Sequence, residues 1–269
     1  MEGEKNEMSF LGHLEELRWH LVRSAAAIFI IGILLFVFQK EVFNHFLLAH
    51  RKSDFITYQI FCDFFNLFGM DSTFCNVAFT DNLISLKPTQ QLMTAIWSSL
   101  ILGIILAFPY LLWELWRFIS PGLTKKEIKS SRGFMFIASF LFFCGIAFSF
   151  YVIAPISIHF LYNYKISDVI QNNFTLESHI GLVTNMLLGV SVLFELPVLV
   201  YFLTKIGLVT PEFLKKYRKH SLVVVLILAA IITPPDVASQ IIVAIPILVL
   251  YEISIKVSRM VIKKQKKDA

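Results

Sequence analysis

Long runs of apolar residues, separated by short polar segments, dominate this chain. Four such runs begin near Leu21, Met93, Gly133 and Ile180, and each extends for roughly 18 to 24 residues. A helix rises about 1.5 Å per residue, so a run of that length can cross a hydrocarbon core of about 30 Å. The pattern therefore predicts four transmembrane helices.

Two further apolar runs near the C-terminus are shorter. Leu222 to Ile232 and Ile241 to Tyr251 contain 11 residues each, or about 17 Å of helix, which fits either two short crossings or a hairpin that returns to its own side. With six crossings, 19 of the 24 lysine and arginine residues fall on the side of the two termini. Basic residues in short loops are retained in the cytoplasm. We therefore predict an all-α protein with six transmembrane helices, the last two short, and with both termini cytoplasmic.

Composition supports this fold class. The chain has 269 residues, of which 57% are hydrophobic and 16% are charged, and its mean hydropathy is +0.70. These values are typical of an integral membrane protein. We predict one membrane domain over residues 1–269, with a long periplasmic loop at 39–91 and a basic cytoplasmic tail at 256–269. Basic loops beside anionic lipid explain the net charge of +5, so the charge does not indicate nucleic-acid binding.

Residues 1–20 are expected to contain an amphipathic helix. Within the segment 8–21, apolar residues recur every three or four positions, which predicts a helix that lies on the cytoplasmic membrane surface. Spacing alone makes the polar residues on its other faces a solvated surface. The apolar stripe comprises Phe10, Leu14, Leu17 and Leu21, and the polar residues include Glu15, Glu16, Arg18 and His20.

Several polar residues stand where predicted helices begin. Thr124 and Glu127 match a capping box, in which the glutamate satisfies free backbone donors at a helix start. Two prolines end the fifth apolar run, and Asp236 behind them is placed to cap the sixth helix at its periplasmic end. Gln240, one turn further, is a polar group inside the membrane that can meet a partner helix. From spacing alone, capping is the simpler interpretation of both Glu127 and Asp236.

One carboxylate, Glu195, lies inside the fourth apolar run. A charged side chain at the centre of a spanning helix costs roughly 2.5 to 3.5 kcal/mol on insertion scales, so such residues usually face a protein or water-lined interior. Pro197 frees a backbone carbonyl nearby and can bend the helix. Two interpretations stay open: a functional group that contacts a partner's span or draws water into the bilayer, and a structural group paired inside the chain's own bundle.

The predicted periplasmic loop contains an aromatic insertion and two cysteines. If the membrane is a bacterial inner membrane, Cys62 and Cys75 lie on its oxidising side, whereas Cys144 lies in the third run. We therefore expect a Cys62–Cys75 disulfide, with two buried free thiols as the alternative. The aromatic residues recur every three or four positions, which predicts a short helix that either lies in the outer membrane interface or packs as a lid on the external helices. They are Phe55, Tyr58, Phe61, Phe65 and Phe68.

Four separated motifs together resemble the TatC family, the multi-span receptors of the twin-arginine protein translocase. They are HLEELR at 13–18, PYLLWELWRFISPGLTKKE at 109–127, FELP at 194–197 and TPPDVASQ at 233–240, in the family's order. The resemblance runs from about residue 9 to 260. It implies a bacterial inner-membrane protein that binds twin-arginine signal peptides of folded precursors on the cytoplasmic side. It also implies an oligomeric complex with single-span TatA- or TatB-type partners, driven by the proton-motive force, without a cofactor or metal ion.

The resemblance also assigns individual residues. Glu16 and Glu127 match the family's signal-binding carboxylates, and Arg18 matches the motif arginine, which we expect to position Glu16 or its helix. Glu195 matches a glutamate on the receptor's inner, concave face. Carboxylates suit this task because each can hold the planar, permanently charged fork of an arginine through two hydrogen bonds.

A proton- or ion-coupled transporter of small solutes is the main alternative, because such proteins use intramembrane carboxylates and prolines. However, the interrupted-helix signal is not repeated in two corresponding halves, and Glu195 is the one acidic residue expected well inside a span. The chain also lacks the motifs G-x-S-x-G and H-E-x-x-H and any pair of intramembrane aspartates. We therefore predict that the protein is not an enzyme.

Overall fold

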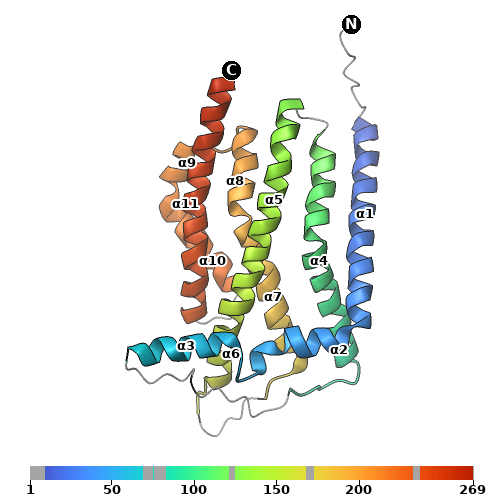
Figure 1. Cartoon of the computed structure of the whole chain (residues 1–269), viewed down its shortest axis with the longest axis vertical. Coiled ribbons are helices and arrows are strands. Elements are labelled where there is room, and N and C mark those ends of the chain that lie inside the picture. Colours follow the sequence, from blue (N-terminus) through green and yellow to red (C-terminus); the bar gives the residue numbers. More distant parts are fainter. Residues whose placement is uncertain are drawn as a thin grey trace. The chain divides into compact units, whose positions relative to one another are not determined.

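The computed structural model describes residues 10–68, 75, 83–120, 125–167, 173–232 and 237–268. Within these ranges the chain is almost entirely helical, with one isolated parallel bridge between Ile84 and Thr175 (Figure 1), which confirms the all-α class. The main helices are α1 (Phe10–Val37), α2 (Gln39–Val42), α3 (Ile56–Leu67), α4 (Gln90–Ile119), α5 (Lys125–Phe148), α6 (Ala154–Asn163), α7 (Leu176–Phe194), α8 (Leu196–Lys205), α9 (Pro211–Lys216), α10 (Arg218–Ile232) and α11 (Val237–Asp268). Short π-helical turns cover Phe43–Leu47 (η1) and Ser149–Ile153 (η5), and a 3₁₀ turn covers Ala49–Arg51 (η2).

Five helical segments of the described chain are long and apolar enough to cross a membrane. The first four coincide with the four long apolar runs and confirm those predictions. The third joins α5, η5 and α6, and the fourth joins α7 and α8. The five segments are Leu14–Val37, Gln90–Ile119, Met135–Asn163, Leu176–Lys205 and Gln240–Gln265.

The two C-terminal helices differ from each other in length. Helix α10 has 15 residues, so it is short, as expected, and its crossing of the membrane stays a prediction. The prediction of a short sixth helix was wrong, because α11 has 32 residues. Polar residues beyond Tyr251 do not end it: Ser254 donates a hydrogen bond to the Leu250 carbonyl, and Ser258 accepts one from Thr204 at 2.9 Å. The basic residues that follow are good helix formers, so the predicted tail continues the helix.

The N-terminal segment also differs from its prediction. Residues 10–21 do not form a separate surface helix but are the first turns of α1, a single helix of 28 residues. The sequence between Gly12 and Gly32 contains neither glycine nor proline. Because nothing there interrupts the backbone hydrogen bonds, the amphipathic segment and the apolar run form one helix.

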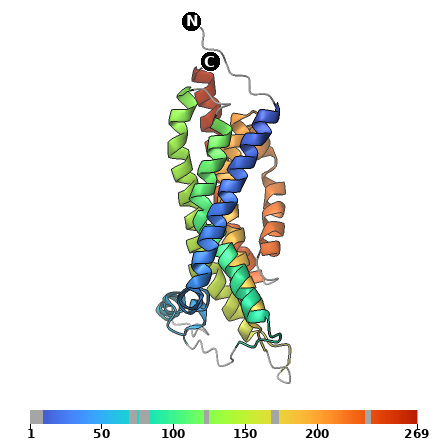
Figure 2. The same cartoon turned by 90° about the vertical axis from the view of Figure 1, so that its right-hand side faces the viewer.

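Contacts divide the chain into two compact units. The first comprises the described residues up to Gln39 together with Ala95–Ser139, and in it α1 lies against α4 (Figure 2). Gly103 makes this contact close, since a Cβ at that position would lie 2.9 Å from the Ile28 carbonyl oxygen and 3.2 Å from the Gly32 Cα atom. The first unit therefore depends on backbone-to-backbone packing of the type that small residues allow between membrane helices.

The second unit comprises Lys40–Thr94 and the chain from Phe140 onward. Its part of α5 touches α7, because a Cβ on Gly145 would lie 2.6 Å from the Ser191 Cα atom. Side chains of α8, α9 and α11 form a buried apolar cluster. The cluster consists of Val200, Leu214 and Ile255, with Val209 and Tyr251 packed against it.

The predicted external loop is fastened to a break in the third spanning segment. Pro155 has no N–H group, which leaves carbonyl groups of the preceding turn without their usual helical donor. The Thr57 hydroxyl donates to the Tyr151 carbonyl at 2.5 Å, and His50 Nε2 donates to the Phe150 carbonyl at 2.8 Å. The loop therefore satisfies the carbonyl groups that the break exposes.

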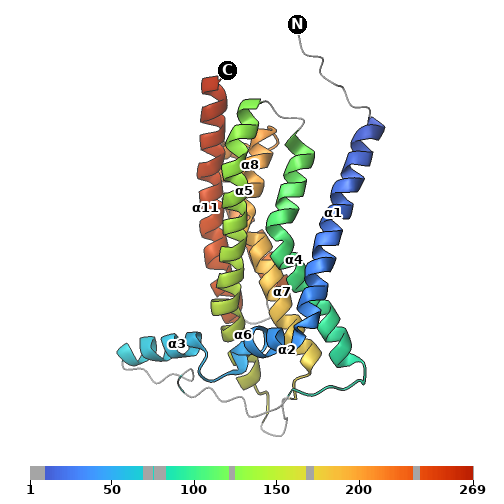
Figure 3. The same cartoon turned by 45° about the vertical axis from the view of Figure 1, so that its right-hand side comes forward.

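The first and later turns of helix α3, which contains most of the aromatic insertion, differ in burial. Its first turn packs like a lid, with Thr57 and Tyr58 buried. Its later turns run crosswise to α11 (Figures 1 and 3) and expose Ile60, Phe64 and Leu67. A position of these later turns in the outer membrane interface stays a prediction.

Cys62 and Cys75 are joined by a disulfide across a sequence separation of 13, and Cys144 is free. Thiol labelling under denaturing, non-reducing conditions should therefore modify Cys144 alone. Cys62→Ser should lower the free energy of unfolding by roughly 3 kcal/mol, because the cross-link restricts the unfolded chain. Cys144→Ser is the matched control. Modification of all three cysteines of the unsubstituted protein under these conditions would exclude the disulfide.

His50 should make the second unit sensitive to acid. Burial lowers the pKa of this ring to about 4, whereas an unfolded histidine has a pKa of about 6.5. Between these values only the unfolded state binds the proton, so stability is complete above about pH 6.5 and falls as the pH approaches 4, with about 2 kcal/mol lost at pH 5. Thermal unfolding in detergent at pH 7 and pH 5 measures the loss. His50→Gln should reduce it by that amount, and an unchanged loss in this variant would contradict the assignment.

Candidate functional site

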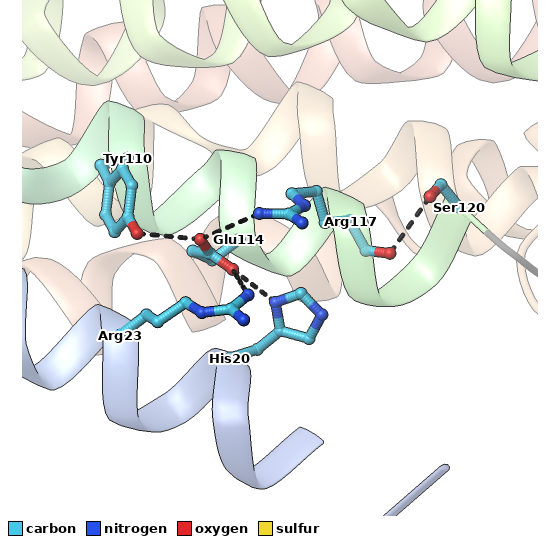
Figure 4. A network of polar contacts seen from close by, with 6 residues as sticks. All are labelled: His20, Arg23, Tyr110, Glu114, Arg117 and Ser120. Atoms are coloured by element: carbon cyan, nitrogen blue, oxygen red, sulfur yellow. Dashed lines mark hydrogen bonds and ion pairs between the residues drawn. The ribbon is translucent and has the colours of Figure 1, made fainter. Parts of the chain in front are cut away.

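The first unit contains a carboxylate buried between two helices. Glu114 of α4 is 3% exposed and lies within the segment Gln90–Ile119 that is long enough to span a membrane. His20 of α1 donates a hydrogen bond from Nδ1 to Glu114 Oε2, and the Tyr110 hydroxyl donates to Oε1 at 2.9 Å (Figure 4). A buried carboxylate needs such partners, because an unsatisfied charge in an apolar environment is costly.

Helical spacing explains why these side chains meet. On α4, Tyr110, Glu114 and Arg117 follow one another at four and three residues, so they lie on one face of the helix. On α1, Glu16, His20 and Arg23 have the same spacing. We call these two stripes, together with the contacts between them, the Glu114 cluster. The His20 ring also packs edge-on against Phe118, with ring centroids 6.1 Å apart.

Two arginines flank the carboxylate at longer range. Arg117 Nη1 lies 3.6 Å from Glu114 Oε1, and Arg23 Nη1 lies 3.9 Å from Oε2. Both distances exceed the usual 2.7–3.2 Å of an N–H···O hydrogen bond, so these contacts are ion pairs without a short hydrogen bond. The Arg23 and Arg117 side chains are 47% and 52% exposed. His20 and Tyr110 therefore hold the carboxylate directly, while the guanidinium groups lie at its rim (Figure 4).

The predicted signal-binding residues Glu16, Arg18 and Glu127 differ in burial and in how far the structure describes them. Glu16 is half-buried on α1, and its Oε2 atom is buried without a hydrogen-bond partner among the described residues. Arg18 is exposed. Glu127 falls in the first turn of α5, but its side chain and its predicted capping partner Thr124 lie outside what the structure describes. Glu16 therefore belongs to the α1 stripe of the Glu114 cluster, and its proximity to Glu127 stays a prediction.

The expected solvated face of the N-terminal segment is only partly correct. Glu15 and Arg18 are exposed, whereas His20 is 8% exposed because it bonds to Glu114. The expectation of one acidic residue within the spans was incomplete, since Glu114 is a second one. The available signal was a glutamate in an apolar run with a tyrosine four residues before it and an arginine three residues after it.

Glu195 lies in the second unit at the junction of α7 and α8, followed by Pro197 within the first turn of α8. Both carboxylate oxygens are buried, and neither has a hydrogen-bond partner in the described part of the chain. The Glu195 backbone still continues the helical ladder, because its carbonyl accepts a hydrogen bond from Leu199 at 2.9 Å. The side chain is thus an unpaired polar group within an apolar helix pair.

The remaining predicted residues lie near the start of α11. Gln240 is half-buried and donates from Nε2 to the Leu226 carbonyl of α10 at 3.0 Å, so its amide already has a contact within the chain. Asp236 lies outside the described residues. Across the described residues, no three histidine, cysteine, aspartate or glutamate side chains are grouped so that they could hold a metal ion. The candidate site is therefore a set of carboxylates with basic and aromatic neighbours, which is suited to binding cations such as guanidinium groups.

Comparison with known proteins identifies relatives along nearly the whole chain. Residues 12–246 match the family model of the Sec-independent protein translocase protein TatC. TatC from Blattabacterium sp. subsp. Periplaneta americana is 40% identical over 98% of this chain and 100% of that protein. TatC from Helicobacter pylori strain J99 is 38% identical over 93% of this chain and 88% of that protein.

Solved structures agree with the sequence comparisons. A crystal structure of the twin-arginine translocase receptor TatC has a TM-score of 0.68 and 30% identity, covering 93% of this chain and 99% of that chain. A second, determined in DDM, has a TM-score of 0.70 and 31% identity over 90% of this chain. The sequence motifs, the helical fold and these relatives agree, and the chain belongs to the TatC family of Sec-independent protein translocase proteins.

Proposed function

We propose that this chain is the receptor of a twin-arginine translocase and binds the signal peptides of folded precursors from the cytoplasmic side. One observation carries the proposal: Glu16, the family's motif glutamate, has a buried carboxylate oxygen without a hydrogen-bond partner among the described residues, one helical turn before His20, which bonds to the buried carboxylate of Glu114. A desolvated carboxylate of this kind gains most from a charged donor, and a guanidinium group provides two hydrogen bonds in a fixed geometry.

The two family carboxylates have separate positions in this proposal. Glu16 receives one arginine of the signal peptide, and Glu127, in the first turn of α5, receives the other. Arg18 is exposed on α1, two residues after Glu16, and its proposed role is to position Glu16 or its helix. Lysine would be a weaker ligand for both carboxylates, because its ammonium group is a point charge that cannot bind them in a bidentate manner.

The protein is a multi-pass membrane protein, and we place both termini in the cytoplasm. The excess of basic residues in the loops on that side supports this orientation. The proposed partners are twin-arginine signal peptides and single-span proteins of the TatA and TatB type, in an oligomeric complex that uses the proton-motive force. Glu195 and Gln240 are the proposed intramembrane contacts for partner spans, and Asp236 is the proposed periplasmic cap.

The family membership removes the main alternative. A proton- or ion-coupled transporter of small solutes is not supported, because the relatives over nearly the full length are protein translocase components. Solute uptake without a signal peptide would be the contrary observation.

Charge at Glu16 and Glu127 should determine signal-peptide binding. Glu16→Gln and Glu127→Gln should each weaken binding of a twin-arginine peptide at least about tenfold, since a hydrogen bond to a charged group contributes roughly 1.5–3 kcal/mol. Titration of a fluorescent peptide into nanodisc-embedded protein measures this. Glu15→Gln, which changes an exposed neighbouring carboxylate, should bind normally. Because glutamine also serves in a capping box, full binding by Glu127→Gln would leave Glu127 with a capping role only.

Glu195 should act after signal binding. Glu195→Ala should insert into the membrane and bind the peptide normally, but transport cargo several-fold more slowly, because the partner contact is lost. Glu195→Gln should be milder, since it keeps a hydrogen-bonding end. Export of a twin-arginine reporter into the periplasm is the measurement, with Val192→Ala on the exposed face of α7 as the control. Normal export by stable Glu195→Ala protein would refute the proposal, and loss of stable protein would favour pairing within the bundle.

A further inference from the structure

Two of the receptor's own arginines form ion pairs with Glu114, a carboxylate of the kind to which we assign binding of signal-peptide arginines. Glu114 is flanked by two guanidinium groups, one from α1 and one from α4, at 3.9 Å and 3.6 Å. The proposed ligand also presents two guanidinium groups. Arg23 and Arg117 therefore stand where arginines of a signal peptide would be bound, if the peptide reached this carboxylate.

These internal arginines are held loosely. Their side chains are about half exposed, and their distances to Glu114 are longer than hydrogen bonds. Ion pairs of this type contribute little to stability, because water and salt screen the charges. The carboxylate itself keeps its position through His20 and Tyr110, whether or not the arginines remain. An incoming guanidinium group can thus replace Arg23 or Arg117 without the carboxylate moving.

Glu16 connects this carboxylate to the proposed binding site. It precedes His20 by four residues on the same face of α1, so the two side chains are neighbours, and His20 bonds directly to Glu114. Glu16 also has an oxygen that is buried and unpartnered within the described chain. Two carboxylates, one with a buried unpartnered oxygen and one with two loosely held arginines, are therefore linked through His20 of α1.

We propose that Glu114 is a specificity-determining residue for arginine recognition, masked by Arg23 and Arg117 until the signal-peptide arginine that binds Glu16 takes over the carboxylate. The inference rests on the proposed receptor function and adds an internal competition to it. A single free cation does not displace the internal arginines, whereas a guanidinium group that is delivered beside a second arginine bound at Glu127 has a high local concentration.

A purely structural role for Glu114 makes different predictions. If Glu114 only holds α1 against α4, its substitution weakens the binding of both peptides equally. Substitution of Arg23 and Arg117 then tightens the binding of neither peptide. The test therefore compares a twin-arginine peptide with its twin-lysine counterpart, by fluorescence anisotropy, on the full chain in nanodiscs. The variants are Glu114→Gln, the double variant Arg23→Gln with Arg117→Gln, and the triple variant that combines them.

The masking model predicts opposite effects. The double variant should bind the twin-arginine peptide about 5- to 10-fold more tightly, because two competitors are gone, while the twin-lysine peptide changes less than about twofold. Glu114→Gln should weaken binding of the twin-arginine peptide at least about fivefold and lower the preference for the twin-arginine over the twin-lysine peptide. The triple variant should not show the tighter twin-arginine binding of the double variant. Arg218→Gln, which removes a similarly exposed arginine paired with Glu252 at 2.6 Å, should bind as the native protein does.

Three results would overturn the inference. The first is that Glu114→Gln weakens binding of both peptides equally. The second is that the double variant binds the twin-arginine peptide no more tightly than the native protein does. The third is that the triple variant keeps the tighter binding, which would then reflect net charge alone. If Glu114→Gln does not fold, the double variant decides the matter, since its two side chains are half exposed. Normal binding by Glu16→Gln would refute the receptor function itself. Weakened binding by Glu16→Gln beside normal binding by Glu114→Gln would refute only the role of Glu114.

Discussion

The need to satisfy one buried carboxylate determines how the first unit is built. Glu114 is buried between two helices, so its oxygens must find donors in the protein. Tyr110 supplies one from the same helix, but the other comes from His20, 94 residues earlier in the chain. This bond sets the register of α1 against α4, and the close approach at Gly103 is possible only in a register that brings glycine to the contact.

The need to satisfy buried polar groups also explains how the external loop packs in the second unit. There the unsatisfied groups are backbone carbonyls, exposed where Pro155 interrupts the third spanning segment. The loop that follows the first span returns to this break, and Thr57 and His50 supply the missing donors. Glu195 is an exception, because a helix junction leaves its carboxylate without a donor in the described chain. Buried polar groups that stay unsatisfied are natural places to look for contacts with other molecules.

The sequence predicted those features that depend on short stretches of chain. Length and hydropathy identified the four long spans, and the spacing of aromatic residues identified α3. The continuity of α1 and the length of α11 were missed because polar residues interrupt the apolar pattern there, although Ser254 and Ser258 satisfy their hydroxyl groups within the helix pair. The bond between His20 and Glu114 was missed for a different reason, since it depends on which helices pack together. The family motifs pointed to Glu16, but local spacing could not reveal its neighbours.

The disulfide has a consequence for how the protein is made. Thiols stay reduced in the bacterial cytoplasm and are oxidised beyond the inner membrane. With the first loop on the outer side, as the basic residues predict, Cys62 and Cys75 can pair only after that loop has crossed the bilayer. The receptor then completes its structure in two compartments of different redox potential, and a supply of oxidant outside the cell's inner membrane becomes a condition for its maturation.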